Sequence, residues 1–131
     1  MVSIKLHSQE LQNVCENLSQ IDDIVTITSC KNYVRFSAIG EFANASIRIN
    51  DVSIEDQEST INIVHGAMSQ SFILKYLLIF TKATGLSRDV RLALSPDAPM
   101  LVEYAIIDDN NINVGHLRFY LPPTAETDDE N

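Results

Sequence analysis

The sequence has few basic residues, few cysteines and no long hydrophobic run. Nine lysines and arginines stand against eighteen aspartates and glutamates, and the resulting formal charge of −9 argues against nonspecific nucleic-acid binding through overall charge. The two cysteines, Cys15 and Cys30, follow no signal-like N-terminus, so we expect free thiols in a reducing compartment. No apolar run approaches the roughly 18 to 20 residues of a membrane span, so we expect no membrane partner.

The residues of known catalytic and metal sites are also missing from any recognisable arrangement. His7, His65 and His116 have no motif spacing to one another or to the cysteines, so neither a zinc site nor a thiol nucleophile is supported. The paired acids at 22–23 and 108–109 fall at expected loops and are interpreted as solvated turn residues. We therefore predict a protein without cofactor, metal or catalytic activity, because function must be argued from a site.

What the sequence does contain is enough apolar material for one domain. The chain has 131 residues, 45% of them hydrophobic, which suffices to bury a core. We place a single domain at residues 1–121. The remaining residues, 122–131, hold four acidic and no basic side chains. An acidic terminus of this kind is typically disordered, and we predict a disordered tail.

The first half of the chain predicts a strand, a helix and three further strands. Apolar and polar residues alternate over 2–6, which is the pattern of a half-buried strand. Apolar residues then recur at helical spacing over 11–18, with Ser8 at the expected N-cap and an end near Ser19. A meander follows at 24–29, 33–39 and 42–50, and an exposed polar connector occupies 51–59.

The second half repeats this order. A strand is expected at 60–65, a helix at about 70–82, and strands at about 88–95, 99–107 and 112–121. The helix has a broad apolar face formed by Phe72, Ile73, Tyr76, Leu77 and Phe80. Its opposite side carries Lys75 and Lys82.

Residues 2–50 and 60–121 thus both have the order βαβββ, an internal structural repeat with little shared sequence. Antiparallel sheet with its helices on one face is the α+β class.

Three separated segments carry a family resemblance. The runs YLLIFTKATGLS, SPDAPMLVEY and GHLRFYLPP closely resemble the proliferating cell nuclear antigen family, the eukaryotic sliding clamps. The resemblance extends from about residue 2 to the acidic tail and concerns only the C-terminal one of that family's two domains. It implies a DNA-clamp domain with two βαβββ units, a nuclear location, and a role in holding replication and repair proteins on DNA.

The resemblance gives the helical lysines a possible role. Lys75 and Lys82 are seven residues apart, which places both on one helix stripe from which they can reach phosphates. From the residues alone, a solvated face is the simpler interpretation. In the family, the helices face DNA inside the ring, and these lysines and Lys5 match basic positions. Asn13 and Glu16, however, stand where the family has arginines. We therefore expect double-stranded DNA to be held only in a closed ring, with weak binding by this chain alone.

A second set of residues matches the pocket in which clamps bind partner peptides. Tyrosine and proline around a small cavity suit an aromatic or aliphatic anchor from a short helical turn. The residues alone would also fit ordinary packing at strand ends. In the family the pocket is completed by an interdomain connector and the N-terminal domain, so we expect half a groove here. The implied partners are DNA polymerase and other proteins with short clamp-binding motifs. The matching residues are Ile73, Ala98, Pro99, Tyr120 and Pro123.

The strand at 44–50 matches the edge strand through which clamp subunits join. An unpaired strand edge is a template for another chain. The interface residues would be Ser46, Ile47, Arg48 and Ile49. The family forms homotrimeric rings, but we do not expect this chain alone to close a ring, since the resemblance lacks the N-terminal domain.

Two further features and two alternatives remain. Lys31 lies in a predicted turn where the family carries its ubiquitin and SUMO acceptor lysine. The stretch 108–114 is longer than in typical family members and predicts a lengthened hairpin loop. Besides a clamp domain, the sequence is compatible with a peptide-binding adaptor or decoy that does not encircle DNA, or with a checkpoint-clamp subunit.

Overall fold

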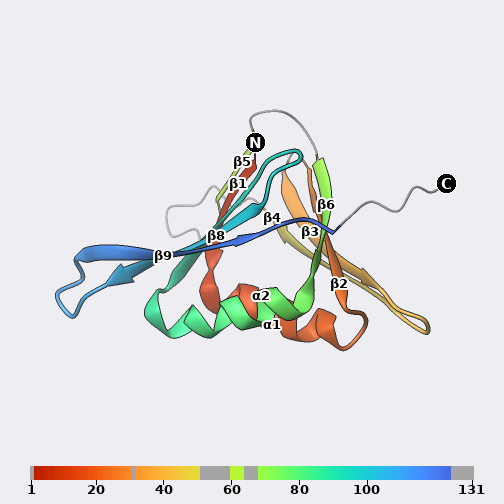
Figure 1. Ribbon diagram of the computed structural model, residues 1–131, viewed down its shortest axis with the longest axis horizontal. Helices are drawn as coiled ribbons and strands as arrows, with labels where there is room; N and C mark the ends of the chain where they lie inside the picture. Colours follow the sequence, from red (N-terminus) through yellow and green to blue (C-terminus); the bar gives the residue numbers. More distant parts are fainter. Residues whose placement is uncertain (1, 31, 51–59, 64–67, 125–131) are drawn as a thin grey trace.

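A computed structural model describes residues 2–30, 32–50, 60–63 and 68–124 (Figure 1). Nine strands, two α-helices and one 3₁₀ helix make up this part of the chain. In chain order they are β1 (Val2–His7), α1 (Ser8–Ser19), β2 (Ile24–Ser29), β3 (Tyr33–Ile39), β4 (Asn44–Asn50), β5 (Thr60–Ile63), β6 (Met68–Ile73), α2 (Leu74–Phe80), the 3₁₀ helix η1 (Thr81–Leu86), β7 (Asp89–Leu94), β8 (Met100–Ile107) and β9 (Asn113–Leu121). The connector at 51–59 and the acidic end of the tail lie outside the described residues.

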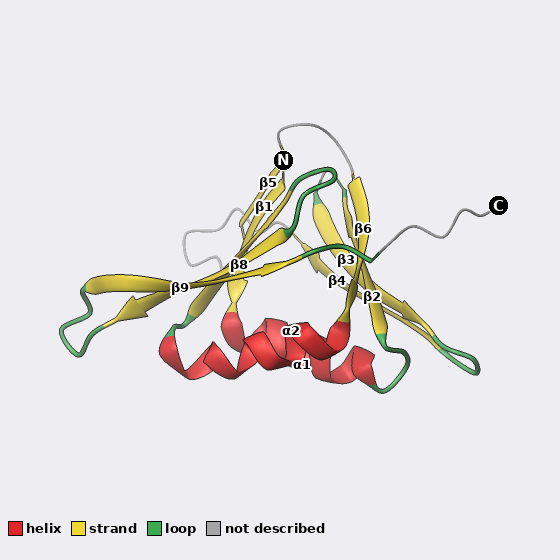
Figure 2. Cartoon of the chain, in the orientation of Figure 1, coloured by secondary structure: helices red, strands yellow, loops and turns green. Residues whose placement is uncertain are grey.

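The strands form two antiparallel sheets, and the predicted α+β class is confirmed (Figure 2). One sheet has the order β5-β1-β7-β8-β9, and the other has the order β4-β3-β2-β6. The strand directly before each helix pairs with the other half of the chain: β1 pairs with β7, and β6 pairs with β2. Each sheet therefore needs both repeats, which ties the two halves of the chain into one unit.

Helix α1 occupies the predicted span, but its first turn differs from the prediction. Leu11, Val14 and Leu18 are buried along one stripe, as the helical spacing indicates. Ser8 is the first helical residue rather than the N-cap, and the N-cap is His7 without a side-chain cap bond. The Ser8 hydroxyl instead contacts the carbonyl oxygens of Ser87 and Arg88, at 2.5 and 3.0 Å. Tertiary contact with the segment after η1 has replaced local capping.

The second helix starts later than predicted. Phe72 and Ile73 belong to β6, which pairs with β2 over its whole length and opposes Ile73 to Ile24. The ladder hydrogen bonds of this pairing decide the conformation, whereas apolar spacing alone allowed a helix. Beyond Phe80 the chain tightens into η1, where the hydroxyl of Thr81 donates to the carbonyl of Leu78 at 2.8 Å.

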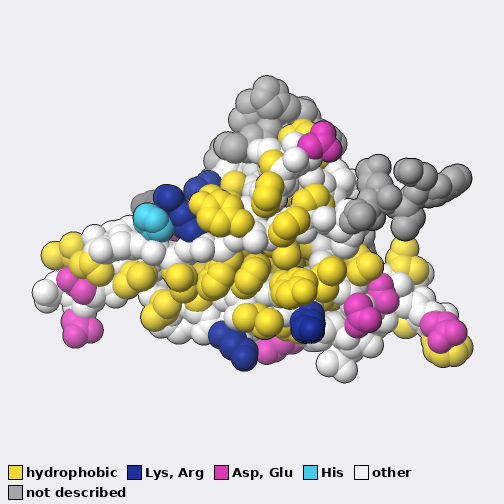
Figure 3. Space-filling view, viewed as in Figure 1, with side chains coloured by type: hydrophobic (Ala, Val, Ile, Leu, Met, Phe, Trp, Pro, Cys, Tyr) yellow, Lys and Arg dark blue, Asp and Glu magenta, His cyan; other side chains and the backbone are white. Residues whose placement is uncertain are grey.

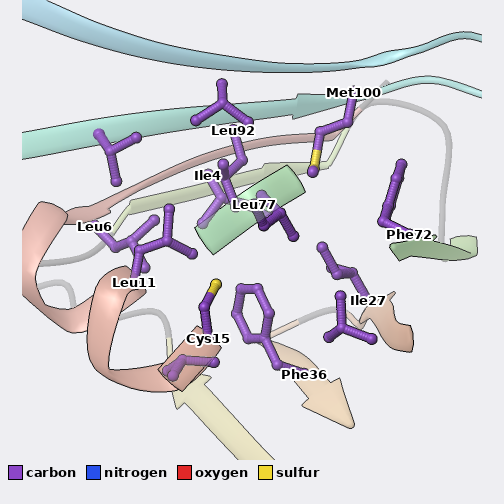
Figure 4. Close-up of a cluster of buried hydrophobic side chains, with 14 of the residues drawn as sticks. Ile4, Leu6, Leu11, Cys15, Ile27, Phe36, Phe72, Leu77, Leu92 and Met100 are labelled. Atoms are coloured by element: carbon purple, nitrogen blue, oxygen red, sulfur yellow. The ribbon is translucent and has the colours of Figure 1, made fainter. Parts of the chain in front are cut away.

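One core lies between the two sheets and the helix layer (Figure 4). The inward residues of β1, β7 and β8 meet those of β2, β3 and the helices. Fully buried members include Ile4, Leu11, Phe36, Phe72, Leu77 and Leu92. The two helices lie side by side beneath the sheets (Figures 1 and 2). Tyr76, predicted on the buried helix face, is instead 43% exposed, because Leu74 and Leu77 point into the core.

Candidate partner-binding surface

The side of α2 next to β9 carries an exposed apolar surface. Tyr76 and Phe80 are four residues apart on α2 and so lie on one side of the helix, and Ile73 ends β6 directly before the helix. Phe80 stacks on Phe119 of β9, with ring centroids 4.4 Å apart and planes 11° apart. This stack joins the helix to the edge strand. Figure 3 shows the hydrophobic side chains gathered as a band over α2, β9 and the segment that follows β9.

We call this surface the apolar band. Its members are Ile73, Tyr76, Ile79, Phe80, Phe119, Tyr120 and Pro123. The most exposed large side chain among them is Tyr120, at 62%. Apolar side chains this exposed are informative when they adjoin one another, because contiguous apolar surface marks contact sites more often than scattered residues do.

Two hydrogen bonds bring together the segments that carry the predicted pocket residues. The backbone N–H of Thr124 donates to the carbonyl of Ser71 at 2.8 Å, which places Pro123 beside β6 and near Ile73. The Gln70 side-chain amide donates to the Ser95 carbonyl at 3.2 Å, which joins β6 to the turn that holds Ala98 and Pro99.

The turn itself is well defined. The N–H of Ala98 bonds the Ser95 carbonyl at 3.3 Å, and Asp97 adopts a left-handed φ of 58°. Met100 is in register with Leu121, so Pro99 lies next to the end of β9, one residue beyond Tyr120. Strand, turn and C-terminal segment thus meet at one corner of the molecule.

The predicted DNA-facing lysines do not all share one surface. Lys75 and Lys82 are both exposed on α2 and η1, and Lys75 borders the apolar band, with its Nζ 6.0 Å from the centroid of the Tyr76 ring. Figure 3 shows basic side chains over this helix layer. Lys5 alternates with the buried Ile4 and Leu6, so it lies on the face of its sheet that points away from the core. Its Nζ is 3.7 Å from a carboxylate oxygen of Asp89.

The other exposed residues of the helix layer do not add positive charge. Asn13 and Glu16 of α1 are exposed, and α1 has no basic residue in its last turn. Against Lys75 and Lys82 on the second helical segment, α1 carries Glu10 and Glu16. The charges of the two helices cancel.

Strand β4 is an edge strand, as the family resemblance implied. It is the outermost member of the four-stranded sheet and pairs only with β3 among the described strands. Ser46 and Arg48 are exposed, whereas Ile47 packs against the core and Ile49 is buried. The exposed residues and the free edge are what another chain could contact, while the two isoleucines anchor the strand to its own domain.

Three further sequence predictions concern chemistry or single side chains. Lys31 lies outside the described residues. Burial, with a smaller contribution from Glu16, raises the pKa of the Cys15 thiol to about 12, so this thiol stays protonated at neutral pH. Both Cys15 and Cys30 are free thiols. Within the described part of the chain, no cluster of three or more potential metal ligands occurs, and no helix is long and apolar enough to cross a membrane.

A comparison with protein families shows which family the chain belongs to. The family model for "Proliferating cell nuclear antigen, C-terminal domain" matches residues 2–124, almost the whole chain. The chain belongs to this family. Membership in the proliferating cell nuclear antigen C-terminal family agrees with the two sheets and the paired helices, and it gives the chain a sliding-clamp type of function in DNA replication and repair.

The apolar band contains residues that sequence reasoning did not assign to a surface. Tyr76 and Phe80 were expected in the buried helix face, and Ile79 and Phe119 received no role. For Phe80 the expectation was partly right, because its side chain is half-buried and packs against the core, whereas Tyr76 is 43% exposed. Phe80 follows the buried Leu77 by three residues and so shares its side of the helix, whereas Tyr76 lies on another side.

Proposed function

We propose that this chain is a non-catalytic sliding-clamp domain that holds replication and repair proteins through the apolar band. The observation that carries the proposal is the corner where Ile73, the turn at 95–99 and the segment after β9 meet beside exposed Tyr120. Such a corner offers apolar contact on several sides, together with a phenolic hydroxyl that can bond a peptide backbone.

The chemistry of the partner follows from this surface. A short helical turn with one aromatic or aliphatic anchor would place that anchor between Tyr120 and Ile73. The band is open to solvent, so few surrounding contacts exclude water from the anchor. We therefore expect dissociation constants of about 100 μM to 1 mM for a single peptide, or roughly −4 to −5.5 kcal/mol.

DNA contact is the second part of the proposal. Lys75 and Lys82 would face phosphates in the nucleus once the domain is part of a closed ring around double-stranded DNA. The support is their exposure on one helical layer, and the opposing observation is the presence of two glutamates on α1. Because nonspecific affinity depends on neutralised phosphates, this chain alone should bind DNA more weakly than the usual 10⁻⁴ to 10⁻⁶ M.

A peptide titration followed by NMR tests the pocket. A peptide with an aromatic anchor in a helical turn should shift the amide resonances of Ile73, Ala98, Tyr120 and neighbouring residues. Tyr120→Ala should abolish the response, because it removes both the apolar wall and the hydroxyl. Tyr33→Ala is the matched control, since Tyr33 lies in the four-stranded sheet. Equal shifts with a scrambled peptide would refute the pocket.

The cancelled charge of the helix layer favours one alternative, a peptide-binding adaptor that does not encircle DNA. The two candidates differ in one measurement. A clamp domain must be retained on circular DNA when it is assembled into a ring, and Lys75→Ala with Lys82→Ala should shorten that retention. An adaptor would bind the peptide equally well and would never be retained on DNA.

A further inference from the structure

The hairpin between β8 and β9 ends in a tip that is both apolar and acidic. It projects from the body at one end of the molecule's longest axis (Figure 1, left). Ile112 and Val114 are 56% and 61% exposed there, next to the acids Asp108 and Asp109. No basic residue stands between Ile107 and Gly115. The tip thus combines exposed aliphatic groups with two negative charges.

The tip is held in one conformation by its own hydrogen bonds. A carboxylate oxygen of Asp108 accepts bonds from the backbone N–H groups of Asn110 and Ile112, both at 2.9 Å. The backbone N–H of Asp108 donates to the Ile112 carbonyl at 2.9 Å, and Asn111 adopts a left-handed φ of 63°. A loop fixed in this way loses little conformational entropy when it enters a contact.

The β3–β4 hairpin, at the other end of the longest axis, has a complementary surface (Figure 1, right). Its outer face holds a shallow hollow of about 410 Å³. Ser37 and Ser46 lie opposite each other in register, and these short side chains leave the space between larger neighbours. Ile39, 74% exposed, borders one end of the hollow, and Arg35 borders the other.

Positive charge at that end of the hollow is not neutralised within the described chain. Arg35 is in register with Arg48, so two guanidinium groups share one face of neighbouring strands. Like charges in this position repel each other. Arg48 lies over the ring of Tyr33 at 4.2 Å and donates to Asn50, and among the described residues neither arginine has a carboxylate partner.

We propose that the β8–β9 tip of one copy of this chain docks into the β3–β4 hollow of a second copy. Ile112 would lie over the two serines against Ile39, and Asp109 would face Arg35 and Arg48. The two surfaces match in apolar character, with Ile112 against Ile39, and in charge, with Asp109 against the two arginines; the Asp108 carboxylate is bonded within the tip. Because the tip and the hollow lie at opposite ends of the molecule, the tip of one copy cannot reach the hollow of the same copy.

The contact is heterologous, since different surfaces of the two copies meet. An open assembly of this kind always keeps one free tip at one end and one free hollow at the other, so it grows with concentration. A hairpin tip covers much less than the 1,200 Å² of a stable interface, so we expect association only at roughly 100 μM or above.

Sedimentation velocity at about 0.15 M salt tests the proposal. The weight-average sedimentation coefficient of the wild-type chain should rise between roughly 10 μM and 1 mM, the range set by the small contact. Ile112→Asp and Arg35→Glu should each remove this rise. Leu86→Asp and Lys82→Glu, which make the same chemical changes at exposed sites elsewhere, should leave it unchanged. A wild-type coefficient that stays constant over this range would overturn the proposal.

A mixture of the two defective variants provides the decisive comparison. The Ile112→Asp copy keeps an intact hollow, and the Arg35→Glu copy keeps an intact tip. Mixed at equal concentration, they should form one-to-one pairs of twice the monomer mass and stop there, because the remaining tip and hollow are both defective. Absence of pairs, or growth beyond pairs, would contradict a tip-in-hollow contact. Circular dichroism spectra that match the wild type establish that each variant is folded.

Discussion

The outer faces of the two sheets differ in how their charged side chains are paired. On the five-stranded sheet, Glu103 of β8 accepts hydrogen bonds from Arg91 and Arg118 on the neighbouring strands, at 2.9 and 2.5 Å. On the four-stranded sheet, Arg35 and Arg48 lie opposite each other, and neither forms an ion pair with an acid of the described residues. Some of its other outward residues join strands through hydroxyl groups, as in the 2.8 Å contact between Thr26 and Ser71 and the 3.1 Å contact between Thr28 and Ser69.

This difference indicates that one face uses its charges to stabilise the domain and that the other face can offer its charges to a partner. Charges that are paired across strands, as at Glu103, contribute to the stability of their own domain and offer little to a partner. Arg35 and Arg48 form no ion pair with a carboxylate of the described residues, and their mutual repulsion falls when a partner supplies negative charge. The five-stranded face is therefore self-contained, and the four-stranded face is suited to another molecule.

The largest expected effect tests whether the two faces belong to one cooperative unit. Phe36 of the four-stranded sheet and Leu92 of the five-stranded sheet are both buried in the common core. Phe36→Ala should lower the free energy of unfolding by about 3–5 kcal/mol and Leu92→Ala by about 2–5 kcal/mol. Fluorescence-detected and circular-dichroism-detected urea unfolding should coincide for both variants. Two separate transitions would mean that the sheets unfold independently.

The charge network of the five-stranded face should have a smaller effect. Glu103→Gln should lower the free energy of unfolding at pH 7 by about 1 kcal/mol, because both arginine partners are partly exposed and solvent screens the pairs. Arg91→Gln and Arg118→Gln should each lose a part of that amount, which urea titration can measure. A Glu103→Gln variant as stable as the wild type would show that the network contributes nothing.

The same carboxylate gives a pH dependence with a defined sign. Hydrogen bonds from Arg118 and Arg91 hold the pKa of Glu103 below its usual value of about 4.3, so the folded state favours the ionised form. The stabilisation is complete above about pH 4.3 and is lost as the pH falls through the folded-state pKa. The stability difference between wild type and Glu103→Gln should therefore shrink at acid pH. A difference that grows below pH 4 would contradict this sign.

The hydroxyl contacts of the four-stranded face should have the next smaller effect on the free energy of unfolding. Thr26→Val keeps the shape of the side chain but removes the bond to Ser71, at an expected loss of about 0.5–1 kcal/mol. Thr28→Val is the matched comparison, because its contact with Ser69 is longer, at 3.1 Å, and more exposed. Thermal unfolding should show the smaller loss for Thr28→Val. The reverse order would mean that burial does not govern these bonds.

The smallest effect is expected at the unpaired arginines. Arg35→Gln should change the free energy of unfolding by less than about 0.5 kcal/mol, and any change should be stabilising, because it relieves repulsion from Arg48. Urea unfolding of Arg35→Gln beside Arg91→Gln compares one arginine substitution on the two faces directly. A clear destabilisation by Arg35→Gln would show that Arg35 serves the fold, and the contrast between the faces would disappear.

Much of the architecture could be predicted from local patterns. The alternation at 2–6, the helical spacing of Leu11, Val14 and Leu18, and the runs that became β7, β8 and β9 were assigned correctly, because each pattern reports burial on one face. The β6 strand was missed. Only Phe72 is fully buried within it, and its conformation depends on pairing with β2, which lies more than forty residues earlier in the chain.

The candidate site, like the fold, could be predicted from the sequence only in part. Sequence by itself determined the two repeats, the class of the fold and the family resemblance, because periodicity and short motifs are local properties. The edge position of 44–50 was implied only by that resemblance. Only the tertiary structure decided that α2 starts at Leu74, that Phe80 stacks on Phe119 of β9, and that Lys5 lies apart from Lys75. These outcomes depend on which distant strands pair, and pairing energy is set by contacts between residues that no local pattern brings together.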